Sequence, residues 1–434
     1  MKLCALLLIV PFAAAFAQDN NAEPPAPSTP ANPGPIVTLA SEFLENDFVN
    51  FFAYTHGVYD SETPVLSNSS VARQSGLGWD AGGGVNAFHR FRDGDVSLSY
   101  RGDYRDYSTT AFGSGTDQNL SLSYVKRLGR RWTAAVEVGA GIYYYGERFY
   151  GATGSNPVEL NPFSPETRFA SASAMTTYQQ TRRLSYTFTG GYSLLRYNYA
   201  GSFGFSSLSG SLAANYRTTA RTTLGGTYSY DHFGYQRNVG TGSGNSVGAT
   251  LYHQFHSHWE VSLFGGVTRS DTSGIVTLPV SLIINGQTVT GFEVGQYHRT
   301  STFPSFTGTV THNLRRMQLS ASGGQSLSGG NGFYLASRNL YFRGVMSKPL
   351  SRRSVFSAYA NSSRLTSVSN TVTNSYESTS FGASYAQNLM RYIGADVTYA
   401  YVRYGTLRPF GATSDNHLAF GITFSSRSIP LTFF

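Results

Sequence analysis

Long runs of residues that alternate between apolar and small or polar side chains recur along almost the whole chain. In one of them, near the C-terminus, the apolar positions are Leu418, Phe420, Ile422 and Phe424. A period of two places one set of residues on each face of a β-strand. Runs of ten or more residues, such as 184–194, have the length that a tilted strand needs to cross a membrane. The sequence therefore predicts long strands with one apolar face.

The composition favours the same class of protein. Charged residues make up 13% of the chain and aromatic residues 15%, with 47 Gly, 30 Tyr and 30 Phe. A soluble enzyme usually carries about 25% charged residues. After the N-terminal segment, no stretch approaches the roughly 18 to 20 apolar residues of a transmembrane helix. These features exclude a helical membrane protein and argue against a soluble enzyme.

The N-terminus has the features of an export signal. Lys2 is followed by a short apolar run, and the small-residue sequence Ala15-Phe16-Ala17 precedes Gln18. We expect residues 1–17 to be a cleaved signal peptide. Residues 18–47 are rich in proline and predict an extended periplasmic linker. Cys4, the one cysteine, lies in the signal, so the mature chain is expected to lack disulfides.

Short basic turns divide residues 48–434 into regular intervals. Successive turns lie roughly 37 to 39 residues apart, except for two wider gaps that hold the long loops at about 146–166 and 269–302. Each interval fits one hairpin of long strands, whereas a propeller blade would need four short ones. Eight turns join sixteen strands, and one strand at each end brings the total to about 18. The turns are Arg92-Asp93-Gly94, Gly129-Arg130-Arg131, Arg182-Arg183, Thr219-Ala220-Arg221, His256-Ser257-His258, Arg315-Arg316, Arg352-Arg353 and Met390-Arg391.

On this alternation and on the motif Leu418-x-Phe420-x-Ile422-x-Phe424, residues 48–434 resemble the porin-like outer-membrane β-barrel proteins of double-membraned bacteria. The resemblance implies an all-β fold, a transmembrane antiparallel up-and-down β-barrel located in the bacterial outer membrane. It also implies that the motif is the signal recognised by the barrel assembly machinery. The chain departs from the family pattern by continuing from Ser425 to Phe434. Many functions share this architecture, so it identifies no solute.

The formal net charge of +8 is unevenly distributed. Twelve arginines lie at or beside the short turns, which leaves the rest of the chain near −4 (8 − 12). We interpret these basic turns as periplasmic residues that contact lipid phosphates at the inner leaflet. Attraction of anionic solutes or of a partner is the alternative.

Strand parity assigns charged residues of both signs to the inner face of the barrel. Opposed charges at a constriction would orient polar solutes by a transverse field, or they could be paired and purely structural. The segment Arg101–Arg105 is the strongest candidate for a constriction. The main candidates are Arg90, Arg101, Asp103, Arg105, Glu137, Arg343 and Asp396. Parity also assigns Asp80, Asp231 and Glu260 to the inner face.

The longest loop, 270–302, contains a hairpin signal of its own. Two apolar runs, 275–284 and 288–294, flank Asn285-Gly286, a dipeptide that favours tight hairpin turns. We expect a folded hairpin. It could fold inward as a constriction, or it could extend the barrel wall.

Motifs for other chemistry are weak. His253, His256 and His258 do not converge on one face of a strand, so no metal site is expected. The sequence 244–248 matches G-x-S-x-G, but it opens a strand instead of lying on a strand-turn-helix elbow. We expect no catalytic residues, no cofactor and no nucleic-acid partner.

The sequence thus predicts a porin-like channel for passive diffusion of small polar solutes, because about 18 strands leave an aqueous channel. The alternative is an export conduit or anchoring barrel of a secretion or polysaccharide-export assembly, which would engage its partner through residues 18–47. Outer-membrane lipids and the barrel assembly machinery are the expected partners, and homo-oligomer formation is left open.

Overall fold

The protein is described here by a computed structural model. It describes residues 48–67, 70–108, 114–144, 166–198, 202–255, 258–284, 287–314, 317–330, 335–351, 353–368, 375–407, 411–426 and 429–430. The predicted signal peptide and linker, residues 1–47, lie outside these ranges. Within the described ranges there is no helix of the length and hydropathy needed to cross a membrane.

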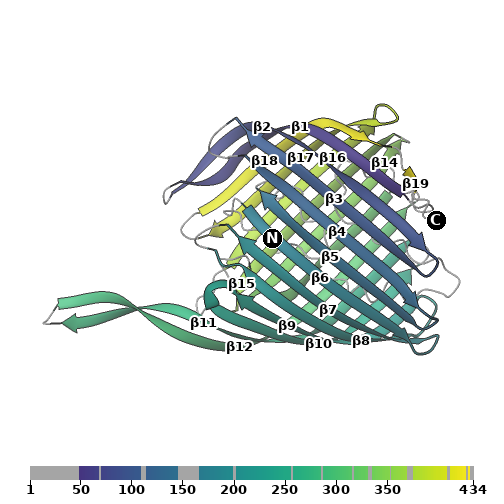
Figure 1. The fold of residues 1–434 in the computed structure, drawn as a ribbon. Coiled ribbons are helices and arrows are strands. Elements are labelled where there is room, and N and C mark those ends of the chain that lie inside the picture. Colours follow the sequence, from purple (N-terminus) through teal and green to yellow (C-terminus); the bar gives the residue numbers. More distant parts are fainter. Residues whose placement is uncertain are drawn as a thin grey trace.

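Nearly all described residues lie in one antiparallel sheet that closes on itself (Figure 1). Each strand pairs with its neighbours in the chain, and β1 pairs with β18, which completes a barrel of 18 strands and confirms the predicted architecture. The strands are β1 (Phe48–Ser67), β2 (Ser70–Phe91), β3 (Gly94–Tyr107), β4 (Gly115–Leu128), β5 (Trp132–Tyr144), β6 (Glu166–Gln179), β7 (Leu184–Tyr197), β8 (Phe205–Arg217), β9 (Thr222–Tyr235), β10 (Gly240–Phe255), β11 (Trp259–Ile284), β12 (Gln287–Leu314), β13 (Met317–Ser328), β14 (Ser337–Ser351), β15 (Ser354–Ser367), β16 (Ser375–Asn388), β17 (Ile393–Leu407) and β18 (Gly411–Ser425).

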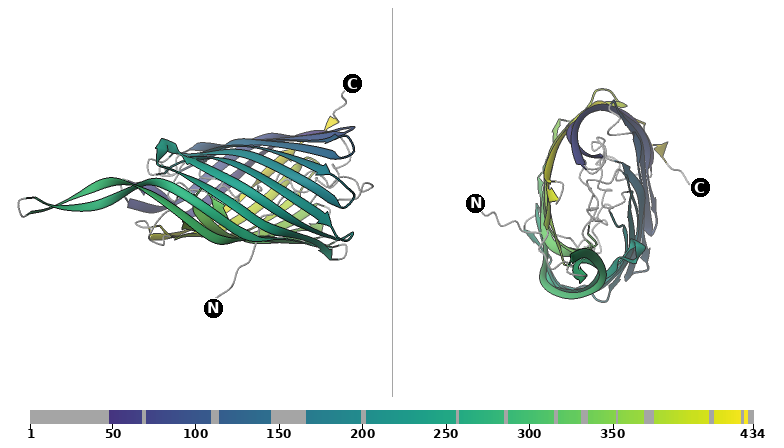
Figure 2. Two further views of the ribbon diagram at one scale, coloured as in Figure 1. Left: turned by 90° about the horizontal axis from the view of Figure 1, so that it is seen from below. Right: turned by 90° about the vertical axis from the view of Figure 1, so that its left-hand side faces the viewer.

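The two ends of the sheet meet at what we call the closing seam, the pairing of β1 with β18. This pairing runs from Phe52↔Ser425 to Asp60↔His417. The two-residue strand β19 (Ile429–Pro430) continues it, because these residues pair with Val49 and Phe48. Part of the C-terminal extension therefore lengthens the seam, while residues 431–434 lie outside the described ranges. The barrel is oval in cross-section (Figure 2).

The eight predicted basic turns all connect paired strands at one end of the barrel. The β4–β5 turn is typical: Gly129 has a φ of +82°, a left-handed conformation that glycine adopts without strain. The connections at the other end include the longer ones, such as the 145–165 segment between β5 and β6. In barrels of this type short turns face the periplasm and long loops face outside, so we call the two ends periplasmic and outer.

The two faces of the wall differ in the way a bilayer requires. Large apolar side chains on the outward face, such as Leu122, Val136 and Phe420, are exposed, the last by 61%. Small and polar residues occupy the inner face, as in the alternate positions of β7 and β8. Closure gives each of the 18 strands a hydrogen-bonded neighbour on both sides over part of its length, whereas an open sheet would present a whole edge of unpaired backbone groups to lipid. The wall is therefore built to span a membrane.

The 270–302 region extends the barrel wall. Its strands, β11 and β12, remain paired without interruption from Trp259↔His312 to Ile284↔Gln287. The resulting hairpin projects well beyond the outer rim (Figures 1 and 2). Of the two alternatives left by the sequence, extension of the wall is confirmed.

A different segment, at the outer end of β13, packs inside the barrel. The β12–β13 pairing stops at Phe306↔Gln325. Beyond that point Leu327 lies directly against Gly244 of β10, and an added Cβ on Gly329 would come within 2.5 Å of the Phe205 ring of β8. Strands β8 and β10 are not neighbours of β13 in the sheet. These contacts therefore cross the interior and narrow the outer end.

Candidate functional site on the inner wall

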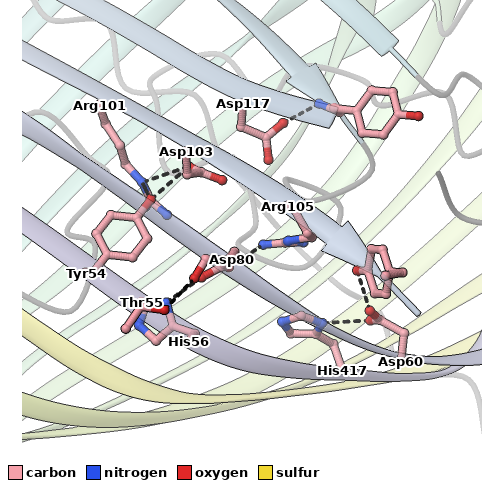
Figure 3. Close-up of polar contacts among 12 residues, drawn as sticks. Tyr54, Thr55, His56, Asp60, Asp80, Arg101, Asp103, Arg105, Asp117 and His417 are labelled. Atoms are coloured by element: carbon pink, nitrogen blue, oxygen red, sulfur yellow. Dashed lines mark hydrogen bonds and ion pairs between the residues drawn. The ribbon is translucent and has the colours of Figure 1, made fainter. Parts of the chain in front are cut away.

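A row of charged side chains crosses the closing seam at one level of the barrel. Register pairs Arg105 of β3 with Asp80 of β2, and Asp80 with His56 of β1. It then pairs His56 with Gly421 of β18, and Gly421 with Asp396 of β17. Five adjacent strands thus each contribute one residue to a line that runs perpendicular to the strands. We call Arg105, Asp80, His56 and Asp396 the charge row (Figure 3 shows its first three members).

The members of the charge row contact one another directly. Arg105 Nη2 lies 2.9 Å from Asp80 Oδ2, and His56 Nδ1 lies 2.8 Å from Asp80 Oδ1. His56 Nε2 lies 3.1 Å from Asp396 Oδ2. All four side chains are at most 4% exposed. A buried carboxylate costs free energy unless it is paired and hydrogen-bonded, and here each carboxylate is both.

Gly421 makes the contact across β18 possible. His56 and Asp396 lie on strands that are not adjacent, since β18 runs between them. A Cβ at position 421 would overlap the imidazole ring of His56 and the carbonyl oxygen of Thr55. The absence of a side chain therefore lets the ring lie over β18 and reach Asp396.

The hydrogen-bonding capacity of the row determines its charge. Ionised carboxylates only accept hydrogen bonds, and both ring nitrogens of His56 face carboxylate oxygens. Both nitrogens can donate only when the ring is an imidazolium. With His56 and Arg105 positive and the two aspartates negative, the row is electrically neutral as a unit.

Two further polar groups flank the charge row. On one side Tyr54 donates a hydrogen bond of 2.8 Å to Asp103, and Arg101 donates one of 2.8 Å to the Tyr54 hydroxyl (Figure 3). Gly82 lies between β1 and β3 here, and an added Cβ would come within 2.7 Å of that hydroxyl.

On the other side of the row, at the outer part of the seam, His417 Nδ1 lies 2.7 Å from Asp60 Oδ1. Tyr107 donates a hydrogen bond to Asp60 from β3. His417 and Asp60 pair directly across the seam and are fully buried. Every charged side chain of these two groups thus has an opposite charge or a hydroxyl beside it.

The residues predicted from the sequence separate into two sets. The structure brings Arg101, Asp103, Arg105 and Asp396 together with Asp80 in the region just described. The remaining candidates lie elsewhere on the wall: Arg90, Glu137, Asp231, Glu260 and Arg343. Their role in selecting solutes stays a prediction.

The separate candidates differ in their surroundings. Arg90 pairs with Asp95 at 3.2 Å, close to the periplasmic turn between β2 and β3. Arg343 lies on β14, where it shares its face with Tyr341. Glu137 is exposed on the inner face of β5 and forms no ion pair with another described residue.

The four residues of the C-terminal motif lie on the outward face of β18. Leu418, Phe420, Ile422 and Phe424 are between 41% and 61% exposed. They are therefore placed to contact lipid. Their recognition by the assembly machinery stays a prediction.

Sequence reasoning missed the seam partners Tyr54, His56, Asp60, Tyr107 and His417. Parity alone puts them on the inner face, but their importance comes from the register between the first and last strands. No local pattern encodes that register. The two glycines between paired residues, Gly82 and Gly421, are the one signal in the sequence that could have been used, because glycine within a strand often marks a close approach.

Residues of the G-x-S-x-G match and of the histidine cluster form hydrogen bonds with neighbouring strands. Ser246 lies within β10, and its Oγ is 2.7 Å from Thr268 Oγ1. His253 contacts Thr222 at 2.9 Å, while His256 lies outside the described ranges. Among the described residues no group of three His, Cys, Asp or Glu side chains could hold a metal ion.

A closed antiparallel barrel with an apolar outer face, a polar inner face and short turns at one end is the architecture of bacterial outer-membrane proteins. The chain is an outer-membrane β-barrel. No family model matches its sequence, and no curated protein matches it.

Three solved structures illustrate the likeness of fold. A BenF-like porin from Pseudomonas fluorescens Pf-5 shares 10% identity over 89% of this chain and 99% of that one, with a TM-score of 0.43. OccK9 (OpdG) from Pseudomonas aeruginosa shares 10% over 87% and 98%, with a TM-score of 0.40. OccAB3 from Acinetobacter baumannii shares 8% over 87% and 99%, with a TM-score of 0.40. At these values the likeness adds nothing to what the strand pairing shows.

Proposed function

We propose that the protein is a porin-like channel for passive diffusion of small polar solutes across the outer membrane. The observation that carries the proposal is the inner face of β5–β8. There Glu137, Ser171, Ser173 and Ser209 point away from the lipid and are exposed. Water therefore reaches this wall, and a barrel of 18 strands is wide enough to enclose an aqueous path.

The position of the path follows from what fills the rest of the interior. At the seam, the inward-facing side chains of the charge row and its neighbours are packed together and buried, so water does not reach the wall there. At the outer end, Phe303, Ala336 and Val368 form an apolar cluster against which Leu327 packs. The path we propose therefore runs along β5–β8, away from the neutralised seam.

The pairing of charges at and beside the seam bears on how the channel would select solutes. A transverse field needs opposed charges on facing walls. Arg101, Asp103 and Arg105 instead lie beside their partners on one wall. We therefore propose weak selectivity, set by the few inner charges outside the seam.

Uptake of uncharged solutes by liposomes tests the function directly. The mature chain is refolded into liposomes, and swelling is followed by light scattering in solutions of sugars of increasing size. We expect rapid swelling with small sugars and a size limit. Liposomes that hold correctly folded barrels and do not swell faster than empty ones would contradict a diffusion channel.

Neutralising Glu137 should shift ion selectivity toward anions. Glu137 is the one carboxylate that faces inward from β5–β8 in the described residues, and it has no cationic partner. We expect Glu137→Gln to move the reversal potential in a KCl gradient toward the chloride potential. The shift should be larger at 0.01 M salt, where the Debye length is about 30 Å, than at 0.1 M, where it is about 10 Å.

Glu377→Gln is the matched control for this experiment. Glu377 lies on the outward face of β16 beside Arg364, at 3.4 Å. Its substitution should leave the reversal potential unchanged. An unchanged potential in Glu137→Gln would place the ion path away from β5.

A further inference from the structure

The periplasmic turns carry a set of exposed arginines that the proposed channel does not use. We call Arg130, Arg131, Arg182, Arg183, Arg221 and Arg353 the basic collar. All six are exposed, and the structure shows no ion pair for any of them among the described residues. The short turns from 91 to 393 contain one acidic residue, Asp93, which lies 3.9 Å from Lys126. The periplasmic turns therefore carry a large excess of positive charge.

The outer end of the barrel does not share this asymmetry. There Arg168 pairs with Glu166, Arg269 with Asp271 at 3.7 Å, and Arg364 with Glu377 at 3.4 Å. The near absence of acidic residues among the arginines is thus a property of the periplasmic turns. Both rims contain arginines, so the difference between the rims lies in the acidic residues beside them.

Apolar side chains beside the basic collar fix its depth in the membrane. Leu128 and Trp132 flank the β4–β5 turn, and they are 51% and 42% exposed. Met390, within the β16–β17 turn itself, is 69% exposed. Exposed Trp and aliphatic residues at a barrel rim lie at the boundary between acyl chains and headgroups. The arginines next to them therefore lie at the level of the phosphates.

The distribution of the basic collar identifies the kind of partner. Its arginines lie on the β4–β5, β6–β7, β8–β9 and β14–β15 turns, which are spread around the barrel. A single soluble partner would contact one side, and a solute would contact the pore mouth. A ring of anions around the whole rim is what the headgroups of a surrounding leaflet provide. Guanidinium groups bind phosphate oxygens through paired hydrogen bonds.

We propose that the basic collar binds anionic phospholipid headgroups of the periplasmic leaflet and gives the barrel a preference for phosphatidylglycerol over zwitterionic lipid. This surface is independent of conduction, since its residues lie outside the inner wall of β5–β8.

Lipid selectivity of the full mature chain tests the proposal. The barrel is reconstituted in phosphatidylcholine, and electron spin resonance measures how strongly spin-labelled phosphatidylglycerol or phosphatidylcholine associates with it. We expect the anionic probe to associate more strongly. Substituting Arg131, Arg183 and Arg221 by glutamine together should reduce its relative association about fivefold at low salt, as expected when each headgroup loses one arginine contact. High salt should have the same effect on the wild type.

The control changes the same number of charges at the outer rim. Arg196, Arg237 and Arg403 are exposed there, and their triple substitution by glutamine should retain the preference for phosphatidylglycerol. Heat-modified mobility on gels confirms that each variant is folded. Equal association of both probes with the wild type would overturn the proposal. A collar variant that keeps the lipid preference but loses anion conductance would also overturn it, and would assign the arginines to the pore mouth.

Discussion

Replacing His56 by alanine is expected to lower the free energy of unfolding by about 3 to 5 kcal/mol, the usual cost of removing one partner from a buried ion pair. The imidazolium is the cation between Asp80 and Asp396, and all three side chains are at most 4% exposed. Without it, the one side-chain hydrogen bond that Asp396 keeps among the described residues is the one from Thr423, at 3.2 Å. Urea titration of the barrel refolded in lipid vesicles, followed by tryptophan fluorescence, measures the change.

His232→Ala is the control for this substitution, because His232 is exposed on the outward face of β9 and has no polar contact with another residue that the structure describes. We expect it to change stability by less than about 0.5 kcal/mol. A His56 variant as stable as this control would show that the charge row does not hold the seam.

Gly421→Ala should destabilise the barrel by about 1 to 3 kcal/mol, the range for forcing a methyl group into a packed site. The new Cβ would overlap the His56 ring and the Thr55 carbonyl oxygen, so β1 and β18 would have to separate locally or the ring would have to leave Asp396. The same urea titration measures the loss.

A double-mutant cycle separates the overlap with the His56 ring from the overlap with the Thr55 carbonyl oxygen. If the ring is the main obstacle, Gly421→Ala should cost less when His56 is already alanine, because the two residues share one site. Gly139→Ala is the matched control on the inner face of β5, where the nearest atom to an added Cβ is Ser171 Oγ at 3.1 Å, a hydroxyl that can rotate away. Additive costs for His56 and Gly421 would contradict the proposed passage of the ring over the glycine.

The architecture could be predicted from the sequence because the properties that define a membrane barrel are local. Alternation in stretches such as 418–424 fixes the two faces of a strand, and turns such as Gly129-Arg130-Arg131 mark where one strand ends and the next begins. Counting the turns gave the number of strands. Parity likewise put Arg101, Asp103 and Arg105 on one face of β3, where the structure places them.

The contacts within the barrel could not be predicted in the same way. His56 and Asp396 are 340 residues apart, and their contact depends on which register β1 adopts against β18 when the sheet closes. The inward packing of Leu327 against β10 has the same origin, since a contact across the interior leaves no periodic signal. The sequence singled out 270–302 because it is the longest loop, but the length of a loop does not determine whether it folds into the barrel or extends the wall.

Single-channel recording of the refolded mature protein in a planar bilayer tests the channel most directly. We expect stable, ohmic conductance steps with weak ion selectivity, because water reaches the inner wall of β5–β8 and the seam charges are neutralised in pairs. No conductance from barrels shown to be folded and inserted would contradict a passive channel and would favour a plugged or partner-gated conduit.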